Sequence, residues 1–187
     1  MANPNPAKLA AAVRARAKKI RVLLMDVDGV LTDGRIWLQS RPDGTALELK
    51  AFSAYDGAGL KMARAAGIRT GLITGRESAA VTQRARECGI QFVYQGRAIK
   101  IGAYEEILRH AQVGDSEVAF IADDLPDLPV LARVGLAVAV ANGVREVKRA
   151  SHYITSRSGG DGAVREAIEL ILKAQGKWEQ AMKHATA

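Results

Sequence analysis

Short apolar runs alternate with amphipathic stretches along most of the chain. Six apolar runs are typical of buried strands and cover residues 21–25, 68–74, 90–94, 117–122, 136–141 and 152–155. Helical patterns cover residues 59–67, 77–89, 99–111, 125–135, 144–150 and 162–176. Strands separated by helices predict right-handed crossovers. The pattern therefore predicts an α/β fold, with a Rossmann-like parallel sheet and helices on both faces.

The first strand-like run is followed by a different pattern. Residues 35–52 contain two strand-like arms around Pro42, Asp43 and Gly44, which together form a strong turn signal. This predicts a β-hairpin directly after the first strand. Residues 1–19 predict a leading basic helix, and residues 176–187 form a weakly amphipathic tail. Because no internal repeat or linker interrupts the pattern, we expect residues 1–187 to form a single domain.

Composition narrows the class of protein. Hydrophobic residues make up 48% and charged residues 25% of the 187 residues, which is typical of a globular protein. No apolar run approaches the roughly 20 residues that a membrane helix needs, so we expect no membrane association. The N-terminal segment lacks the apolar centre of a secretory signal. The single cysteine, Cys88, excludes an internal disulfide and favours a reducing, cytoplasmic location.

The net charge of +7 raises the question of nucleic acid binding. The basic residues do not form one stripe, however, and aromatic residues make up only 5% of the chain, so nucleic acid is not the expected partner. A surplus of positive charge also attracts small anions toward a site. We therefore expect a small anionic substrate.

Polar residues directly follow several of the predicted strands. In parallel sheets, sites form at the carboxyl ends of the strands. This rule selects residues 26 and 28, 74–76, 95–96, 123–124 and 142–143. Their convergence at one edge of the sheet is a stronger signal than any single motif.

Four of these residues are aspartates from two different strand ends: Asp26, Asp28, Asp123 and Asp124. They would repel each other if brought together without a cation, and oxygen ligands with a substrate phosphate suit Mg²⁺. An EF-hand calcium loop does not fit, because Val30 and Leu31 stand where that loop needs an oxygen ligand and a glycine. Zinc is disfavoured by scattered histidines and the single cysteine.

The spacing of Asp26 and Asp28 suits phosphoryl transfer. One carboxylate can attack phosphorus while the other moves the proton. Thr74 and Gly75 can supply a hydroxyl and backbone amides to the phosphate, and the following helix adds its N-terminal field. Lys100, which opens a later helix, can supply a cation.

Four ordered motifs complete this picture: DVDGVLTDG, LITGR, the lysine of YQGRAIK, and ADDLPD. With them the sequence resembles the haloacid dehalogenase superfamily phosphatases. The resemblance implies that Asp26 is the nucleophile, Asp28 the acid/base, and Thr74 and Lys100 phosphate ligands. It also implies that Asp123 binds magnesium together with Asp26 and the backbone carbonyl of Asp28.

The match extends over residues 15–178 to the capless subgroup that contains 3-deoxy-D-manno-octulosonate 8-phosphate phosphatases. It is carried by ARAKKIRVLLMDVDGVLTDG, LKAFSAYDGAGLK, ADDLPDLPVL and GGDGAVRE. The resemblance implies a small phosphorylated sugar or sugar acid as substrate. It also implies a homotetramer that assembles through the hairpin at residues 35–52, with a neighbouring subunit closing the site. The alternatives are another small phosphomonoester, such as a nonulosonate 9-phosphate, and a non-catalytic scaffold with the same fold.

The sequence departs from the subgroup at three positions that bear on the substrate. Tyr55 and Lys61 replace arginines that flank the turn at residues 56–57, and Asp161 replaces an arginine in GGRGAVRE. Neither tyrosine nor lysine reproduces the bidentate carboxylate binding of arginine. The sugar-acid substrate is the part of the prediction that these departures affect.

Five further residues complete the predicted site. The retained arginines Arg76 and Arg84 are expected to contact the substrate. The resemblance places Asp56 and Gly57 near the pocket, although a helix N-cap explains Asp56 equally well. We expect Asp124 to support the metal ligands from behind, and Asp127 to have a structural role at a helix start.

Overall fold

The computed structural model describes residues 6–186 of the chain. The part of the predicted leading helix before residue 6, and the last residue of the tail, lie outside the described residues. The single-domain organisation stays a prediction.

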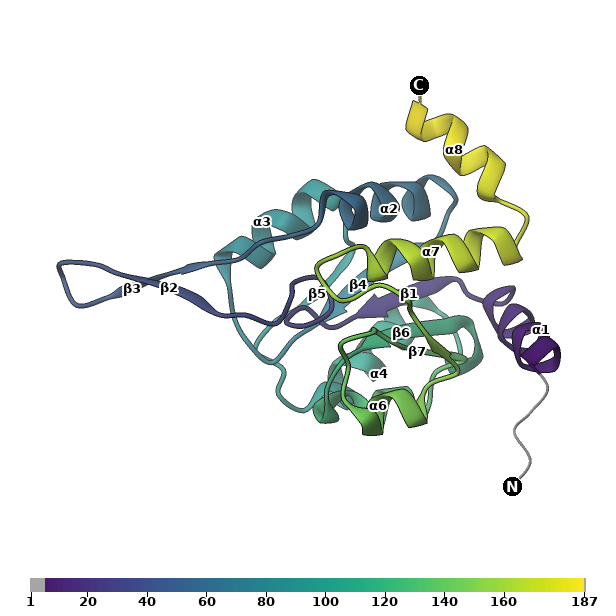
Figure 1. Cartoon of the computed structure of the whole chain (residues 1–187), viewed down its shortest axis with the longest axis horizontal. Coiled ribbons are helices and arrows are strands. Elements are labelled where there is room, and N and C mark those ends of the chain that lie inside the picture. Colours follow the sequence, from purple (N-terminus) through teal and green to yellow (C-terminus); the bar gives the residue numbers. More distant parts are fainter. Residues whose placement is uncertain (1–5, 187) are drawn as a thin grey trace.

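A six-stranded parallel sheet forms the centre of the molecule (Figure 1). Its strands lie in the order β5-β4-β1-β6-β7-β8, so β1 is central and the chain turns from one half of the sheet to the other beside it. The strand bounds are β1 Val22–Met25, β4 Arg69–Ile73, β5 Phe92–Tyr94, β6 Val118–Ala122, β7 Leu136–Ala139 and β8 Tyr153–Ile154. This confirms the predicted α/β fold with a parallel sheet.

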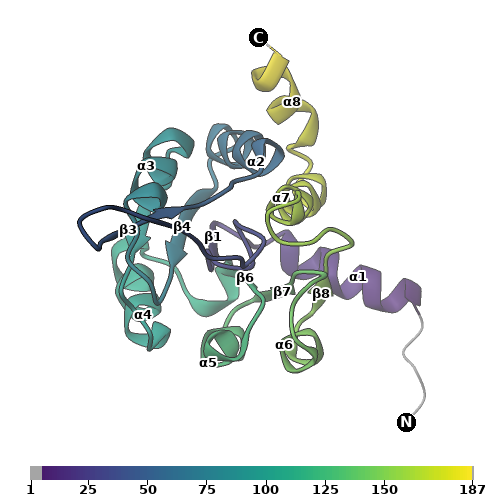
Figure 2. The ribbon, with the colours of Figure 1, turned by 60° about the vertical axis from the view of Figure 1, so that its left-hand side comes forward.

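Helices cover both faces of the sheet, as Figure 2 shows from the side. One face is covered by α1 (Pro6–Ala17), α2 (Ala54–Ala65), α3 (Ala79–Cys88) and α7 (Ala163–Ala174), and α8 (Trp178–Thr186) packs on α2 and α7. The other face is covered by α4 (Lys100–Ala111), α5 (Leu128–Leu131) and α6 (Arg145–Ala150).

Strand β1 supplies both cores, because side chains alternate across a strand. Leu23 and Met25 point into one core, and Val22 and Leu24 into the other. All four are fully buried. Burying each side chain of this size contributes about 1.5–3 kcal/mol. The carboxyl end of β1 is therefore held firmly from both faces.

Within the described residues, two helices differ from their predicted bounds by more than two residues. Helix α2 begins at Ala54 rather than at residue 59, because the Ser53 side chain accepts a hydrogen bond from the backbone N–H of Asp56 and caps the helix. Residues 125–135 were predicted as one helix, but they form a 3-10 turn at Leu125–Asp127 and the short α5. Pro126 and Pro129 provide the reason, since neither can donate a backbone hydrogen bond.

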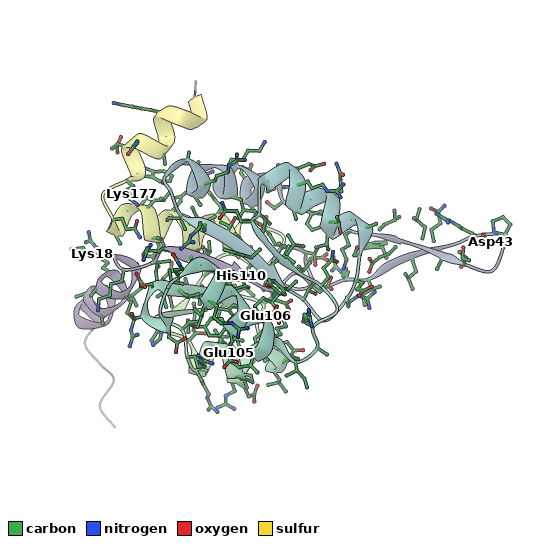
Figure 3. All side chains as sticks on the ribbon, turned by 180° about the vertical axis from the view of Figure 1, so that it is seen from behind. Lys18, Asp43, Glu105, Glu106, His110 and Lys177 are labelled. Carbon is green, nitrogen blue, oxygen red and sulfur yellow. The ribbon has the colours of Figure 1, made fainter. Side chains whose placement is uncertain are left out.

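A two-stranded hairpin projects from the body of the molecule (Figure 1). Strands β2 (Trp37–Ser40) and β3 (Ala46–Leu49) pair antiparallel, which confirms the predicted hairpin after the first strand. At its tip, Thr45 N–H donates to the Asp43 carboxylate over 2.9 Å. Figure 3 places Asp43 at one end of the molecule and Lys18 and Lys177 toward the other. Within residues 6–186, no helix combines the length and apolarity that a membrane span requires.

Candidate active site

Three neighbouring strands bring their carboxyl ends to one edge of the sheet. Met25, the last residue of β1, is in register with Leu72 of β4 and Ile121 of β6. The chain leaves the sheet directly beyond these positions, at Asp26, Thr74 and Asp123. This is the point where the strand order reverses, which is where open α/β sheets bind ligands.

These strand ends surround a cavity of about 280 Å³. All four predicted catalytic residues line it. The lining residues are Asp26, Asp28, Thr74, Gly75, Arg76, Ala98, Lys100, Asp123, Asp124 and Pro126. The structure therefore brings together the nucleophile, acid/base, phosphate and metal residues that were predicted from separate motifs.

Lys100 lines the cavity and is 4% exposed. Its Nζ lies 2.9 Å from Asp26 Oδ1 and 2.6 Å from Asp127 Oδ1. Burial disfavours the charged form, but the two carboxylates outweigh it and raise the pKa of the Lys100 ammonium. The lysine is therefore a fixed cation at the start of α4.

Two aspartates of the site have strongly perturbed acidities. Burial raises the pKa of Asp26 to about 6, with Asp127 adding to the rise and Lys100 opposing it. Burial and the neighbouring carboxylates, Asp26 first among them, raise the pKa of Asp123 to about 7. Both pKa values rise mainly because the carboxyl groups are buried, and neighbouring carboxylates add to the rise.

This arrangement fits a divalent cation. Carboxylate oxygens of Asp26, Asp123 and Asp127 lie within 4.8 Å of one another. Among the residues that the structure describes, Asp123 Oδ1 and Asp127 Oδ2 are buried without a hydrogen-bond partner. Buried oxygens without partners are costly, and hard oxygen donors suit Mg²⁺. Asp28, whose backbone carbonyl was predicted as a ligand, adds no carboxylate to this group.

Gly29 lets the first motif approach Asp123. Its φ is +91°, and a Cβ built on it would lie 2.0 Å from Asp123 Oδ2. The carbonyl of Gly29 accepts a hydrogen bond from Asn142 Nδ2 over 3.0 Å, and Asn142 Oδ1 accepts one from the N–H of Gly159 over 2.6 Å. Asn142 thus ties the turn after β1 to the loop before α7.

Asp28 contacts the base of the hairpin rather than the other aspartates. Lys50 Nζ donates a hydrogen bond to Asp28 Oδ1, and Arg76 Nε lies 3.7 Å from Asp28 Oδ2. Arg76 also forms an ion pair with Glu48 over 2.8 Å. The sequence patterns did not indicate that Lys50 or Glu48 lies near the site. Both residues belong to a hairpin arm in which charged and apolar residues simply alternate.

The two aspartates after β6 make different contacts, and the roles predicted for them stay predictions. Asp127, predicted to have a structural role at a helix start, is fully buried and its carboxylate contacts Lys100. Asp124, predicted to support the metal ligands, lines the cavity with an exposed side chain that accepts a hydrogen bond from the N–H of Leu125. The 3-10 turn at Leu125–Asp127 brings Asp127 back to Lys100.

Thr74 is buried and does not cap the next helix. Helix α3 begins at Ala79 with Ser78 as its N-cap, two residues later than the predicted start at residue 77. The backbone N–H of Arg76 instead donates toward Thr74 Oγ1 over 3.4 Å. The loop after β4, rather than the helix terminus, therefore presents hydroxyl and amide groups to the cavity.

Three residues predicted to bind substrate do not line this cavity. The carboxylate of Asp56 accepts hydrogen bonds from the N–H groups of Gly162 and Arg165, at 3.3 and 2.8 Å. Arg84 donates to the carbonyl of Ser53 over 2.8 Å, and its guanidinium covers Gly57. In this chain these residues join α2 to α7 and α3.

The geometry defines an aspartate-based phosphatase site, and comparisons with known proteins agree. Residues 91–168 match the family model of haloacid dehalogenase-like hydrolases. The chain is 45% identical over 166 residues to the 3-deoxy-D-manno-octulosonate 8-phosphate phosphatase of Yersinia pestis, covering 89% of this chain and 87% of that protein. The Escherichia coli enzyme of the same name is 41% identical over 173 residues, covering 92% and 90%.

A solved structure shows the same fold. It is the 3-deoxy-D-manno-octulosonate 8-phosphate phosphatase from Moraxella catarrhalis, in complex with magnesium ion, phosphate ion and KDO. It is 41% identical to this chain, with a TM-score of 0.86, and the match covers 92% of this chain and 97% of that one. The chain is thus a phosphatase of the haloacid dehalogenase class. It belongs to the family of 3-deoxy-D-manno-octulosonate 8-phosphate phosphatases.

Proposed function

We propose that this chain hydrolyses the phosphomonoester of 3-deoxy-D-manno-octulosonate 8-phosphate, with Mg²⁺, through an aspartyl-phosphate on Asp26. One observation carries the proposal: Asp26, Asp28, Thr74, Lys100 and Asp123 line one cavity at the strand-order reversal. The same chemistry is named for the relatives that match most of the chain.

Asp26 acts as nucleophile in this mechanism. Its carboxylate attacks phosphorus in line while the bond from phosphorus to the sugar oxygen breaks, and Asp28 donates a proton to that oxygen. Asp28 then accepts a proton from the water that attacks the aspartyl-phosphate. This step releases inorganic phosphate and returns both aspartates to their starting states.

Lys100 and Thr74 hold the phosphoryl group. The Lys100 ammonium lies 2.9 Å from Asp26, so it can contact a phosphate oxygen while it keeps the nucleophile oriented. Thr74 and Gly75 can offer a hydroxyl and backbone amides to the same cavity. Mg²⁺ bound by Asp26 and Asp123, with Asp127 beside them, would neutralise charge on the transferred group.

The three departures from the subgroup fall outside the catalytic cavity. Tyr55, Lys61 and Asp161 are all exposed, and none of them lines it. We therefore expect them to bear on how the sugar is held rather than on phosphoryl transfer. Arg76 is the cation beside the cavity that is best placed for a sugar carboxylate.

We also propose a homotetramer that works in the cytoplasm. Support for assembly comes from the hairpin, where several large apolar side chains are exposed in one chain: Ile36, Trp37, Leu38, Leu47 and Leu49. Exposed apolar surface of this extent favours association.

A panel of phosphorylated sugars tests the function. We expect Mg²⁺-dependent phosphate release that is fastest with 3-deoxy-D-manno-octulosonate 8-phosphate and is abolished by EDTA. Asp26→Asn should lower turnover by about a thousandfold or more. Asp33→Asn is the matched control, because Asp33 lies in the same loop but is exposed and accepts from the N–H of Arg35. Faster phosphate release from a nonulosonate 9-phosphate would identify that compound as the substrate instead. Full activity of Asp26→Asn would show that Asp26 is not the nucleophile.

A further inference from the structure

Four charged side chains connect the hairpin to the catalytic cavity in a closed ring of alternating sign. Lys50 Nζ donates to Asp28 Oδ1 and lies 3.5 Å from Glu48 Oε1. Arg76 completes the ring, at 2.8 Å from Glu48 and 3.7 Å from Asp28. The ring joins the loop after β1, the end of β3 and the loop after β4.

Lys50 is the buried member of this ring. Its side chain is 1% exposed, whereas that of Arg76 is 46% exposed. A lysine is almost never fully buried unless it is paired, because removing an ammonium from water costs free energy. The carboxylates of Asp28 and Glu48 offset that cost, so the position of the ammonium and that of Asp28 are coupled.

The two oxygens of Asp28 are therefore not equivalent. Oδ1 is occupied by Lys50, while Oδ2 faces Arg76 at a longer distance. Asp28 lines the cavity, but Lys50 does not. Lys50 can thus influence a reaction in the cavity directly through Asp28, and otherwise only through Glu48 and Arg76.

We propose that Lys50 is a positioning residue for proton transfer, which rests on the acid/base role proposed for Asp28. Lys50 holds Oδ1, which leaves Oδ2 to carry the proton. As the bond from phosphorus to the sugar oxygen breaks, the proton moves from Oδ2 to that oxygen, and the resulting carboxylate stays paired with the Lys50 ammonium. The base of the hairpin then contributes to catalysis and also connects the site to strands β2 and β3.

The test compares Lys50→Met with Lys50→Arg in the full chain. With a sugar phosphate, Lys50→Met should lower kcat by about tenfold to a hundredfold and leave KM within about twofold, because misplacement of an acid affects the transition state. With p-nitrophenyl phosphate the release of nitrophenolate in the first turnover should slow by under about threefold, since nitrophenolate leaves without a proton and this step precedes the attack of water. Lys50→Arg should recover most of the activity. Lys173→Met, which removes an exposed lysine paired with Glu169, is the matched control.

Several outcomes would overturn the proposal. They are an equal slowing of the first turnover on both esters, a raised KM with unchanged kcat, or a normal kcat with a lowered Tm. The last outcome would leave Lys50 only a structural role. If the aryl ester is a poor substrate, the effects of Lys50→Met on kcat and on KM with the sugar phosphate decide the test. The variant Asp28→Asn distinguishes a failure of this inference from a failure of the acid/base role proposed for Asp28. If Asp28→Asn shows the leaving-group dependence and Lys50→Met does not, only the inference fails; if neither shows it, the acid role of Asp28 fails.

Discussion

At the residue scale, the site concentrates negative charge around a lysine. Asp26 and Asp123 have pKa values raised to about 6 and about 7, and burial is the first cause in both cases. A carboxyl group whose pKa is higher in the folded than in the unfolded protein favours folding when protonated. The metal-free protein should therefore lose stability as pH rises toward and through these values.

Asp123→Asn tests this electrostatic conflict. In EDTA, wild-type Tm should fall as pH rises from about 5 to 8, and Asp123→Asn should reduce that fall because it removes one titrating group. Mg²⁺ should raise the wild-type Tm at pH 8 more than at pH 5, since protons compete with the cation. The variant should lose most of this gain. Thermal unfolding at both pH values checks the result, and an unchanged pH dependence in Asp123→Asn would contradict it.

At the element scale, α2 is fixed to the start of α7 by one buried carboxylate. Asp56 is 1% exposed, and both its oxygens accept backbone hydrogen bonds, from Gly162 and from Arg165. Helix N-termini present such unpaired N–H groups, and a carboxylate suits their positive end. The motif that suggested substrate binding is thus accounted for in this chain by helix docking.

Asp56→Ala should destabilise the protein without removing a group from the cavity. We expect a loss of about 2–3 kcal/mol in the free energy of unfolding, since buried N–H groups lose a charged acceptor. The kcat of the folded fraction should stay within about twofold. Urea unfolding and turnover of the same samples measure both quantities, and Asp161→Ala, an exposed carboxylate nearby, should be near neutral. A large fall in kcat with unchanged stability would favour the substrate role instead.

At the scale of the whole molecule, periodicity and motif order predicted most of the architecture. The strand ends at Asp26, Thr74 and Asp123 could be located because parallel strands bring their ends to one edge. The contacts of Lys50 and Glu48 could not be predicted, because they depend on how the hairpin base folds against the loop after β1. The contact of Asp127 with Lys100 could not be predicted either, because it depends on a turn whose geometry two prolines determine.

The apolar surface of the hairpin leads to the last prediction. In the antiparallel register, Trp37 pairs with Leu49 and Gln39 with Leu47, so these side chains share one face of the ribbon. Trp37, Leu47 and Leu49 are 56%, 38% and 48% exposed. An isolated two-stranded ribbon is marginally stable in water, and a second copy of the chain that covers this face would stabilise it.

Leu47→Glu should therefore weaken assembly. We expect the wild type to run at about four times the 20.0 kDa of one chain, and the variant to run at a smaller mass, because burying a glutamate in an apolar contact is costly. Light scattering coupled to size exclusion gives the masses, and far-UV circular dichroism confirms that the fold is kept. Ile154→Glu is the matched control, since Ile154 is 48% exposed on β8, away from the hairpin. A tetramer that survives Leu47→Glu, or equal dissociation by both variants, would show that this face does not hold the assembly together.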